Sequence, residues 1–326
     1  MKIAVYSPNW IGDSVLALPF IRCLRVSYPN AEIYIFCKEW VSGIYENNPN
    51  ISNIFYFKNE VLKSFKGTIK AGLKIRKIKL DQFYTLTDSF RSALVLGISG
   101  SSKTIGYKSQ MRSIFLTNSI NTPNSKIHRS KKYLGLLDNP KESNDIPYIH
   151  ITQEEKKWGV EEIEKMGMKN PVGLSPFSVS DQRTIPNDEI MRWLQNSRNE
   201  YLIFGSKNDI QKGKSLLNSL KKLSIKSICG NYSLRKSIIL ISLCKFTLAA
   251  DSGLGHISAA LGIPTISFFG AGSPKVTGPI GDKIEIIKHC FPCKGEVCKN
   301  YGEGEVCIQK ISKIDIEDAV KKLMII

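Results

Sequence analysis

The chain has 326 residues, 42% of them hydrophobic, with 46 lysines and arginines against 29 aspartates and glutamates, so its formal net charge is +17; this length predicts two domains. No apolar run reaches 18 residues and the opening stretch, MKIAVYSPNWIGD, is interrupted by polar residues and glycine, which argues against a transmembrane helix and a signal peptide and predicts a cytoplasmic protein. The excess positive charge favours an anionic partner, which leaves nucleic acid, an anionic membrane surface or a phosphorylated substrate.

The first elements predict a strand–loop–helix–strand unit. Residues 2–7 and 31–37 read as buried strands, and residues 14–27 between them repeat apolar side chains with the helical period. The loop after the first strand lacks the G-x-G-x-x-G pattern of dinucleotide-binding proteins. Asp13 is expected at the N-cap of the helix, at the carboxyl edge of the first strand, where a catalytic group lies in an open parallel sheet.

The alternation of strands and helices continues through the first half. Further strands are predicted at 54–57, 82–86 and 104–107, and helices beginning at 88 and over 130–137 and 153–166, while 118–145 is otherwise irregular. The stretch 63–79 reads as a helix with a cationic face, although a solvated lysine-rich surface is an equally simple interpretation. Residues 168–171 resemble a linker, which places the domains at 1–168 and 169–326.

The second half repeats the same organisation. Its predicted strands are 172–175, 201–205, 226–229, 246–250, 265–269 and 283–287, and its helices include 188–196, 209–223, 233–243 and a closing helix at 314–323 that either stays with this half or packs back on the first domain. We therefore predict an α/β protein with two Rossmann-like domains that face a cleft.

The stretch 246–270 is the most informative in the chain. A buried strand ends at Asp251-Ser252-Gly253, a short helix follows, and a second buried strand ends at Gly270. A helix beginning near Gly253 offers free backbone N–H groups and a positive dipole end to an anion such as a diphosphate, and Gly253 and Gly255 add no Cβ to obstruct it. His256 lies on the same side as Ser252. The simpler interpretation is that Asp251 or Ser252 only caps the helix and that His256 is solvated.

Four cysteines near the end are spaced as Cys290-x2-Cys293-x4-Cys298-x8-Cys307. Such a cluster is compatible with a structural zinc or iron–sulfur site, but the second pair does not have the spacing of a standard zinc finger. Reduced thiols or a local disulfide are the alternatives.

Several of these segments together resemble glycosyltransferase family 9, the lipopolysaccharide heptosyltransferases, nearly end to end. The motifs are PNWIGDS at 8–14, SFRSAL at 89–94, IGY at 105–107 with Met111-Arg112, DSGLGH at 251–256 and AALGIP at 259–264. The middle segments are most similar to the heptosyltransferase II branch. The resemblance implies a GT-B type fold and an inverting transfer without an active-site metal or other cofactor. It also implies ADP-L-glycero-D-manno-heptose as donor and the lipopolysaccharide core on lipid A as acceptor.

The resemblance also suggests roles for individual residues. Asp13 is the expected general base. The expected acceptor-binding residues are Asn9, Trp10, Arg91 and Arg112, and the expected donor-binding residues are Ser175, Ser178, Arg183, Asp209, Asp251, Ser252, Gly253 and His256. Arg183 stands where the family usually has lysine, and a guanidinium can clamp a diphosphate with two hydrogen bonds. Asp209 would bind the donor's ribose or only cap its own helix, and Asp251 would position other groups.

Two other readings of the function remain open. The chain could be a family 9 enzyme that uses a different nucleotide sugar, or a basic α/β protein that binds without catalysis. Binding to nucleic acid is not expected, because the sequence shows no interleaved aromatic and basic repeat and no helix-turn-helix or RNP-like motif. The positive charge is better explained by a phosphorylated lipid acceptor and by peripheral contact with the anionic inner membrane surface.

Overall fold

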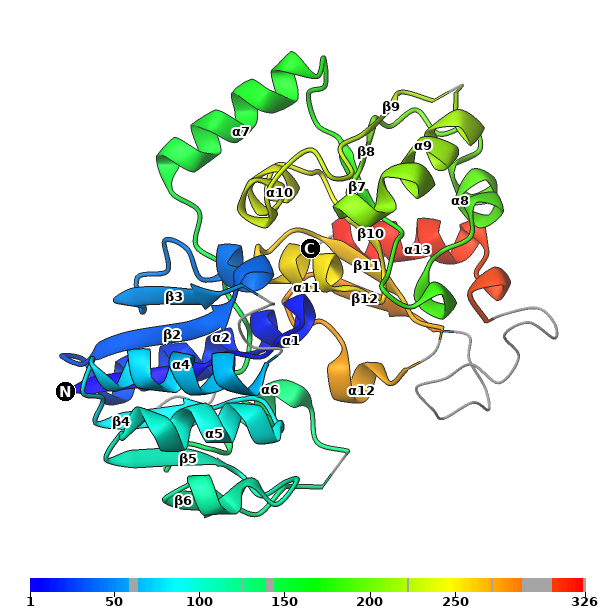
Figure 1. Cartoon of the computed structure of the whole chain (residues 1–326). Helices are drawn as coiled ribbons and strands as arrows, with labels where there is room; N and C mark the ends of the chain where they lie inside the picture. Colours follow the sequence, from blue (N-terminus) through cyan, green and yellow to red (C-terminus); the bar gives the residue numbers. More distant parts are fainter. Residues whose placement is uncertain are drawn as a thin grey trace. The chain divides into compact units, whose positions relative to one another are not determined.

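In a computed structural model the chain divides into two compact units, Met1–His150 and Ile151–Ile326. The structure describes residues 1–58, 64–124, 126–138, 144–221, 223–270, 272–288 and 307–324. Over these residues each unit is built on a six-stranded parallel sheet with helices packed on it (Figure 1). The predicted α/β fold with two Rossmann-like domains is confirmed.

The sheet of the first unit has the strand order β3-β2-β1-β4-β5-β6. Its strands are β1 (Lys2–Tyr6), β2 (Glu32–Lys38), β3 (Asn53–Phe57), β4 (Gln82–Thr85), β5 (Lys103–Tyr107) and β6 (Asn118–Ile120). Its helices are α1 (Ile11–Leu16), α2 (Leu18–Ser27), α4 (Phe65–Arg76), α5 (Phe90–Ser99) and α6 (Arg129–Leu134), with short 3-10 helices η1 (Glu39–Ile44) and η2 (Arg112–Phe115). The central strand β1 pairs with β2 on one side and with β4 on the other, and its Ile3, Ala4 and Val5 are buried because helices cover both faces of a parallel sheet.

The sheet of the second unit has the order β12-β11-β10-β7-β8-β9. Its strands are β7 (Val172–Ser175), β8 (Tyr201–Ile203), β9 (Ile225–Ser227), β10 (Thr247–Ala250), β11 (Thr265–Phe268) and β12 (Ile284–Ile287). Its helices are α7 (Gln153–Lys165), α8 (Asn187–Leu194), α9 (Ile210–Ser219), α10 (Leu234–Ile241), α11 (Gly253–Ala260), α12 (Pro274–Thr277) and α13 (Lys313–Met324), with 3-10 helices η3 (Asp181–Arg183), η4 (Lys207–Asp209) and η5 (Cys307–Lys310).

The two sheets share one topology. Numbered from its own first strand, each unit has the order 3-2-1-4-5-6, in which successive strands are added in one direction from the first strand and in the other direction from the fourth. Ligands of such sheets bind beyond the carboxyl ends of the strands at this switch point. The switch points lie after β1 and β4 in the first unit and after β7 and β10 in the second, so Asp13 and the 251–256 motif follow strands that border them.

Two local predictions in the first unit were wrong. The helix expected over 14–27 is split into α1 and α2, because Pro19 in the first turn of α2 has no N–H to continue the hydrogen-bond ladder. The stretch after 118, expected to be irregular, contributes the edge strand β6, whose Asn118 and Ser119 align with Ile105 and Gly106 of β5. A three-residue polar strand gives too short an alternation to be recognised in the sequence.

The contacts divide the chain at 150/151, earlier than the linker expected at 168–171, because α7 packs on the second unit. Arg235 of α10 forms a buried ion pair with Glu155 of α7 at 2.6 Å, and a Cβ on Gly159 would lie 2.8 Å from Ile239. The closing helix α13 also belongs to the second unit: its Ile316, Ala319 and Leu323 join that unit's core, so the suggested return to the first domain is not what the structure shows.

Candidate functional site

Asp13 lies at the switch point of the first unit, in the first turn of α1. The sequence suggested Asp13 as the N-cap, but the N-cap is Trp10, because the helix begins at Ile11, before Asp13. The loop before it rests on a buried cluster of hydroxyls: Ser7 Oγ lies 2.6 Å from Tyr45 Oη, and Ser14 Oγ donates to the carbonyl oxygen of Pro8 at 3.2 Å. This cluster fixes the backbone that carries Asp13.

The environment of Asp13 favours its protonated form. Its side chain is 21% exposed, and burial raises the pKa of the carboxyl group above its usual value, while Arg129 and Lys132 act in the opposite direction and Asp88 raises it further. Arg129 Nε lies 3.7 Å from Asp13 Oδ1. A carboxylate with a raised pKa is a stronger base once it is ionised.

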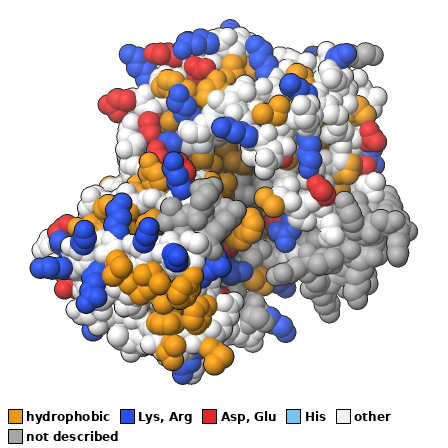
Figure 2. Space-filling view, in the orientation of Figure 1, with side chains coloured by type: hydrophobic (Ala, Val, Ile, Leu, Met, Phe, Trp, Pro, Cys, Tyr) orange, Lys and Arg blue, Asp and Glu red, His pale blue; other side chains and the backbone are white. Residues whose placement is uncertain are grey.

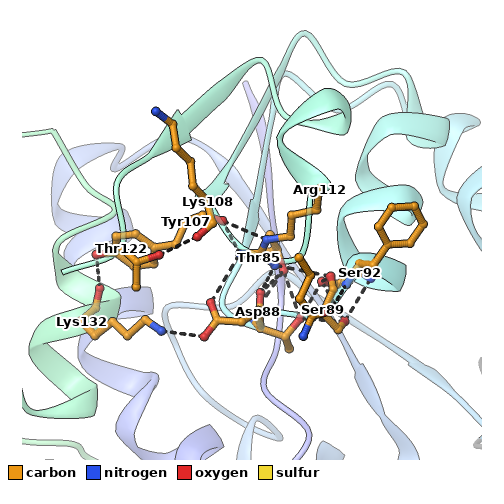
Figure 3. Close-up of polar contacts among 12 residues, drawn as sticks. Thr85, Asp88, Ser89, Ser92, Tyr107, Lys108, Arg112, Thr122 and Lys132 are labelled. Carbon is orange, nitrogen blue, oxygen red and sulfur yellow. Dashed lines mark hydrogen bonds and ion pairs between the residues drawn. The ribbon is translucent and has the colours of Figure 1, made fainter. Parts of the chain in front are cut away.

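Asp88 stands at the centre of a second charge network at the same edge of the sheet (Figure 3). Its Oδ2 accepts a hydrogen bond from Lys132 Nζ at 2.6 Å, and its Oδ1 lies 3.5 Å from Arg112 Nη2. In the sequence, residue 88 marked only the predicted start of a helix, but the N-cap of α5 is Ser89. The sequence did not indicate Arg129 and Lys132 either, because only the fold brings α6 to the end of β4.

Arg112 does not have the acceptor-binding role expected from the resemblance. Its side chain is fully buried, and its guanidinium donates to the carbonyl oxygen of Tyr107 at 2.9 and 2.7 Å and to that of Thr87 (Figure 3). A substrate cannot reach a guanidinium enclosed in this way. Arg112 instead holds the loop after β4 against the end of β5, and so positions Asp88.

Replacing Arg112 with methionine is expected to reduce the free energy of unfolding by about 2 kcal/mol, because the carbonyl oxygen of Tyr107 loses both guanidinium donors and that of Thr87 keeps only the Thr85 hydroxyl. Urea unfolding would measure the loss. The matched control is Arg76→Met on α4, where the arginine is exposed and a change within about 0.5 kcal/mol is expected. Equal stabilities of the two variants would contradict this account.

Replacing Asp88 with asparagine is expected to move the acid limb of the kcat/KM profile to lower pH. Removal of a neighbouring negative charge lowers the pKa of Asp13, and Lys132 is then released to lower it further. A base with a lower pKa stays ionised to lower pH. Initial rates across a pH series would measure the shift, and Asp318→Asn on exposed α13 is the matched control. An unmoved limb would show that Asp88 does not influence the pKa of the group whose protonation ends activity.

A pocket of about 170 Å³ opens beside this edge. Its lining residues come from the ends of β1 and β2 and from α4 and α5: Tyr6, Asn9, Lys38, Thr68, Ser89, Arg91 and Val95. The predicted acceptor residues Asn9 and Arg91 therefore meet in one pocket, whereas Trp10 is 62% exposed and is not part of its lining. Among the described residues, no group hydrogen-bonds the buried Oδ1 of Asn9. Lys38, which the sequence analysis did not single out, adds a second cation.

The predicted donor residues of the second unit gather after β7 and β10. Asp251 is 6% exposed, and its Oδ2 lies 3.4 Å from Arg183 Nη1. Ser178 Oγ donates to the carbonyl oxygen of Asp251 at 3.3 Å. Burial raises the pKa of Asp251 to about 6, opposed by Arg183 and Lys288. The backbone at Gly272 passes close to Asp251: a Cβ on residue 272 would lie 3.2 Å from Asp251 Oδ2. The φ of +97° at Gly272 also suits only glycine.

The helix α11 begins at Gly253 without a side-chain cap. Ser252 occupies the N-cap position, but within the described part of the chain its buried Oγ has no hydrogen-bond partner. The simple capping interpretation is therefore wrong. His256 is buried, not solvated. Gly255 serves packing and not an anion, since its Cβ would lie 3.2 Å from Ala249 Cβ.

The remaining two predicted donor residues differ in their surroundings. Ser175 is buried at the carboxyl end of β7. Asp209 Oδ2 accepts hydrogen bonds from Ser206 N at 2.8 Å and Ser206 Oγ at 2.6 Å, which closes the capping box of η4, whereas at the N-cap of its own helix α9 its side chain makes no capping hydrogen bond. Its ribose contact stays a prediction.

The cysteine cluster is only partly described. Cys307 is buried in η5, and Cys290, Cys293 and Cys298 lie outside the described residues. The metal and thiol alternatives stay predictions.

Comparison with known proteins gives one family. The model of "Glycosyltransferase family 9 (heptosyltransferase)" matches residues 69–304. Lipopolysaccharide heptosyltransferase 2 of Escherichia coli K12 is 25% identical and aligns over 94% of this chain and 95% of its own length. Lipooligosaccharide heptosyltransferase 2 of Campylobacter jejuni serotype O:6 is 23% identical, with 99% of each chain covered.

Solved structures agree on the fold. The structure of E. coli ADP-heptose LPS heptosyltransferase II superimposes with a TM-score of 0.84 at 23% identity, covering 100% of this chain and 99% of that one. A family 9 glycosyl transferase from Veillonella parvula gives 0.89 at 18% identity, covering 99% and 97%.

Proposed function

The chain belongs to glycosyltransferase family 9, and from this membership we propose that it transfers heptose from ADP-L-glycero-D-manno-heptose to the inner core of lipopolysaccharide. The two relatives named above are called heptosyltransferases, and this chain aligns with nearly the whole length of each. The proposal rests on what lies at the two switch points. One holds the partly buried carboxyl group of Asp13, whose pKa is raised, and the other holds Arg183 and several hydroxyl groups, which suit a diphosphate.

We assign Asp13 as the general base of an inverting, metal-independent transfer. Its carboxylate takes the proton of the acceptor hydroxyl as the new bond to the anomeric carbon forms, and the bond from that carbon to the diphosphate breaks on the opposite face. ADP leaves with the electron pair. Asn9 and Arg91, which line the pocket of the first unit, would hold the acceptor, and Lys38 would add a charge for its anionic groups.

The donor would lie in the second unit. Arg183 and the N-terminus of α11 at Gly253 would neutralise the charge that develops on the leaving diphosphate. Ser175, Ser178, Ser252 and His256 would donate hydrogen bonds, and Asp251 would orient Arg183.

The test is a panel of donors measured by calorimetry: ADP, GDP, UDP and ADP-heptose. We expect a clear preference for ADP and its heptose, followed by transfer to core lipid that lacks heptose. Preference for another nucleotide would keep the family but replace the donor. Failure to bind any of them would favour a non-catalytic binding protein.

We further propose peripheral contact with the cytoplasmic face of the inner membrane. The acceptor is held by lipid, and the net charge of +17 suits an anionic surface. Within the described residues, no helix is both long and apolar enough to cross a bilayer. Such contact should weaken as salt screens the charges.

A further inference from the structure

The exposed face of α4 carries two parallel strips of side chains. Phe65, Ile69 and Leu73 recur every four residues and form an apolar strip, in which Phe65 is 61% exposed. Lys66, Lys70 and Lys74 recur beside them with the same spacing. The opposite face of α4 is buried in the core of the first unit.

The apolar strip continues onto α5 and η2. Helices α4 and α5 lie side by side, so close that a Cβ on Gly72 would lie 2.7 Å from Ile98 (Figure 1). Phe90 at the start of α5 stacks edge-on against Phe115 of η2, with ring centroids 5.3 Å apart. Next to Phe115, Ile114 is 80% exposed and Met111 is 89% exposed. Figure 2 shows the hydrophobic side chains gathered over these elements, with lysines and arginines along one edge.

The fold holds this surface in place. Met111 has a positive φ of 55°, which is unfavourable for methionine and persists only where neighbouring contacts fix the backbone. Arg112, the residue after Met111, provides those contacts: its buried guanidinium donates hydrogen bonds to the carbonyl groups of Tyr107 and Thr87. The two most exposed apolar side chains of this surface, Met111 and Ile114, are thus presented to solvent by a fixed turn.

We propose that this surface, formed by α4, the start of α5 and η2 and here called the apolar–basic face, docks on an anionic lipid bilayer. The proposal rests on the proposed function, because it names where the membrane contact of that enzyme is made. Large apolar side chains enter the boundary between headgroups and acyl chains, and flanking lysines bind anionic headgroups.

The charge pattern favours a bilayer over a second copy of the chain. Between residues 64 and 80 there are six lysines and arginines, Lys66, Lys70, Lys74, Arg76, Lys77 and Lys79, and no acidic residue. A symmetric dimer through this face would place like charges against each other. The face also adjoins the acceptor pocket, since Phe90 precedes the pocket residue Arg91 and Thr68 of α4 lines the same pocket. A lipid-held acceptor would therefore be presented beside its pocket.

The test is flotation of the full-length protein with vesicles of phosphatidylcholine, alone or mixed with phosphatidylglycerol. Wild type is expected to bind the mixed vesicles preferentially and to lose binding as salt is added. Met111→Asn with Ile114→Ser should weaken binding about tenfold, and asparagine keeps the left-handed turn. Lys70→Gln with Lys74→Gln should also weaken it about tenfold.

The matched controls change the same residue types on exposed helices of the second unit: Ile314→Ser on α13, and Lys156→Gln with Lys157→Gln on α7. These should bind vesicles within about twofold of wild type, because their side chains lie outside the face. Equal losses in the control and face variants, or equal binding to both kinds of vesicle, would overturn the proposal. The proposal would also be overturned if a face variant bound vesicles as well as wild type does and sedimented as a monomer where wild type sediments as a dimer.

A second readout separates this inference from the proposed enzyme activity. On a deacylated, water-soluble acceptor the face variants should keep wild-type turnover, while on the lipid acceptor in vesicles they should lose it. If wild type binds anionic vesicles but transfers to neither acceptor, the proposed function fails and the docking face stands. If wild type transfers to both but the face variants lose nothing on vesicles, the docking face fails alone.

Discussion

Replacing Asp13 with asparagine is expected to lower kcat by about 10²- to 10⁴-fold, the usual contribution of a general base. Asparagine has nearly the same shape but cannot accept the proton of the acceptor hydroxyl at neutral pH. Calorimetry should show ADP affinity within about twofold of wild type, because the donor residues belong to the other unit. Single-turnover rates with saturating donor would measure the chemical step directly.

Stability provides the control for this variant. Burial disfavours the charged form of Asp13, so a neutral side chain should leave Tm at pH 7 unchanged or slightly raised. The loss of rate then cannot be attributed to unfolding. In wild type, the raised pKa places the acid limb of kcat/KM above the range of an ordinary aspartate, because activity falls as the base becomes protonated. Wild-type turnover in Asp13→Asn, or an acid limb at the ordinary aspartate value, would remove Asp13 from this role.

The fold followed from local sequence patterns, whereas the roles of most expected donor residues were implied by the family resemblance. Apolar strands separated by helical repeats predict parallel sheets, and a polar turn after a buried strand indicates the carboxyl edge of that sheet. Arg183 and Asp251 were both expected near a diphosphate, and the structure brings them to 3.4 Å of each other. The sequence could not show that they form an ion pair, since they lie in separate strand–helix units.

The surroundings of Asp13 were less predictable, because the charges that act on its carboxyl group come from elements distant in sequence. The charges around Asp13 come from α6 and from the loop after β4, and no local pattern links these segments. Arg112 illustrates the opposite error. The family resemblance implied that this arginine binds the acceptor, yet its guanidinium is buried among backbone carbonyl groups. Burial of one side chain is a tertiary property and cannot be read from neighbouring residues.

Replacing Arg183 with glutamine is expected to weaken ADP binding by about 10- to 100-fold at pH 8, because a charge-assisted hydrogen bond to the diphosphate is lost. The variant also leaves Asp251 without the cation that most lowers its pKa. Above its pKa of about 6, wild-type Asp251 is ionised and repels the diphosphate unless Arg183 neutralises it. The loss should therefore shrink as pH falls and Asp251 becomes protonated. Calorimetry from pH 5 to 8 would measure it, with Arg198→Gln as the matched control in the same unit.

A double-mutant cycle with Asp251→Asn separates two roles of Arg183. If Arg183 mainly neutralises Asp251, then Arg183→Gln should cost almost nothing in the Asp251→Asn background, and the pH dependence should vanish with it. If Arg183 contacts the diphosphate directly, the cost should persist in that background at every pH. The 3.4 Å separation and the partial exposure of Arg183 favour the second result: the guanidinium is held by one edge against Asp251, and its 32% exposed remainder can meet a ligand. A cost that disappears with Asp251 would make Arg183 a partner of that carboxylate and leave the helix α11 to bind the diphosphate.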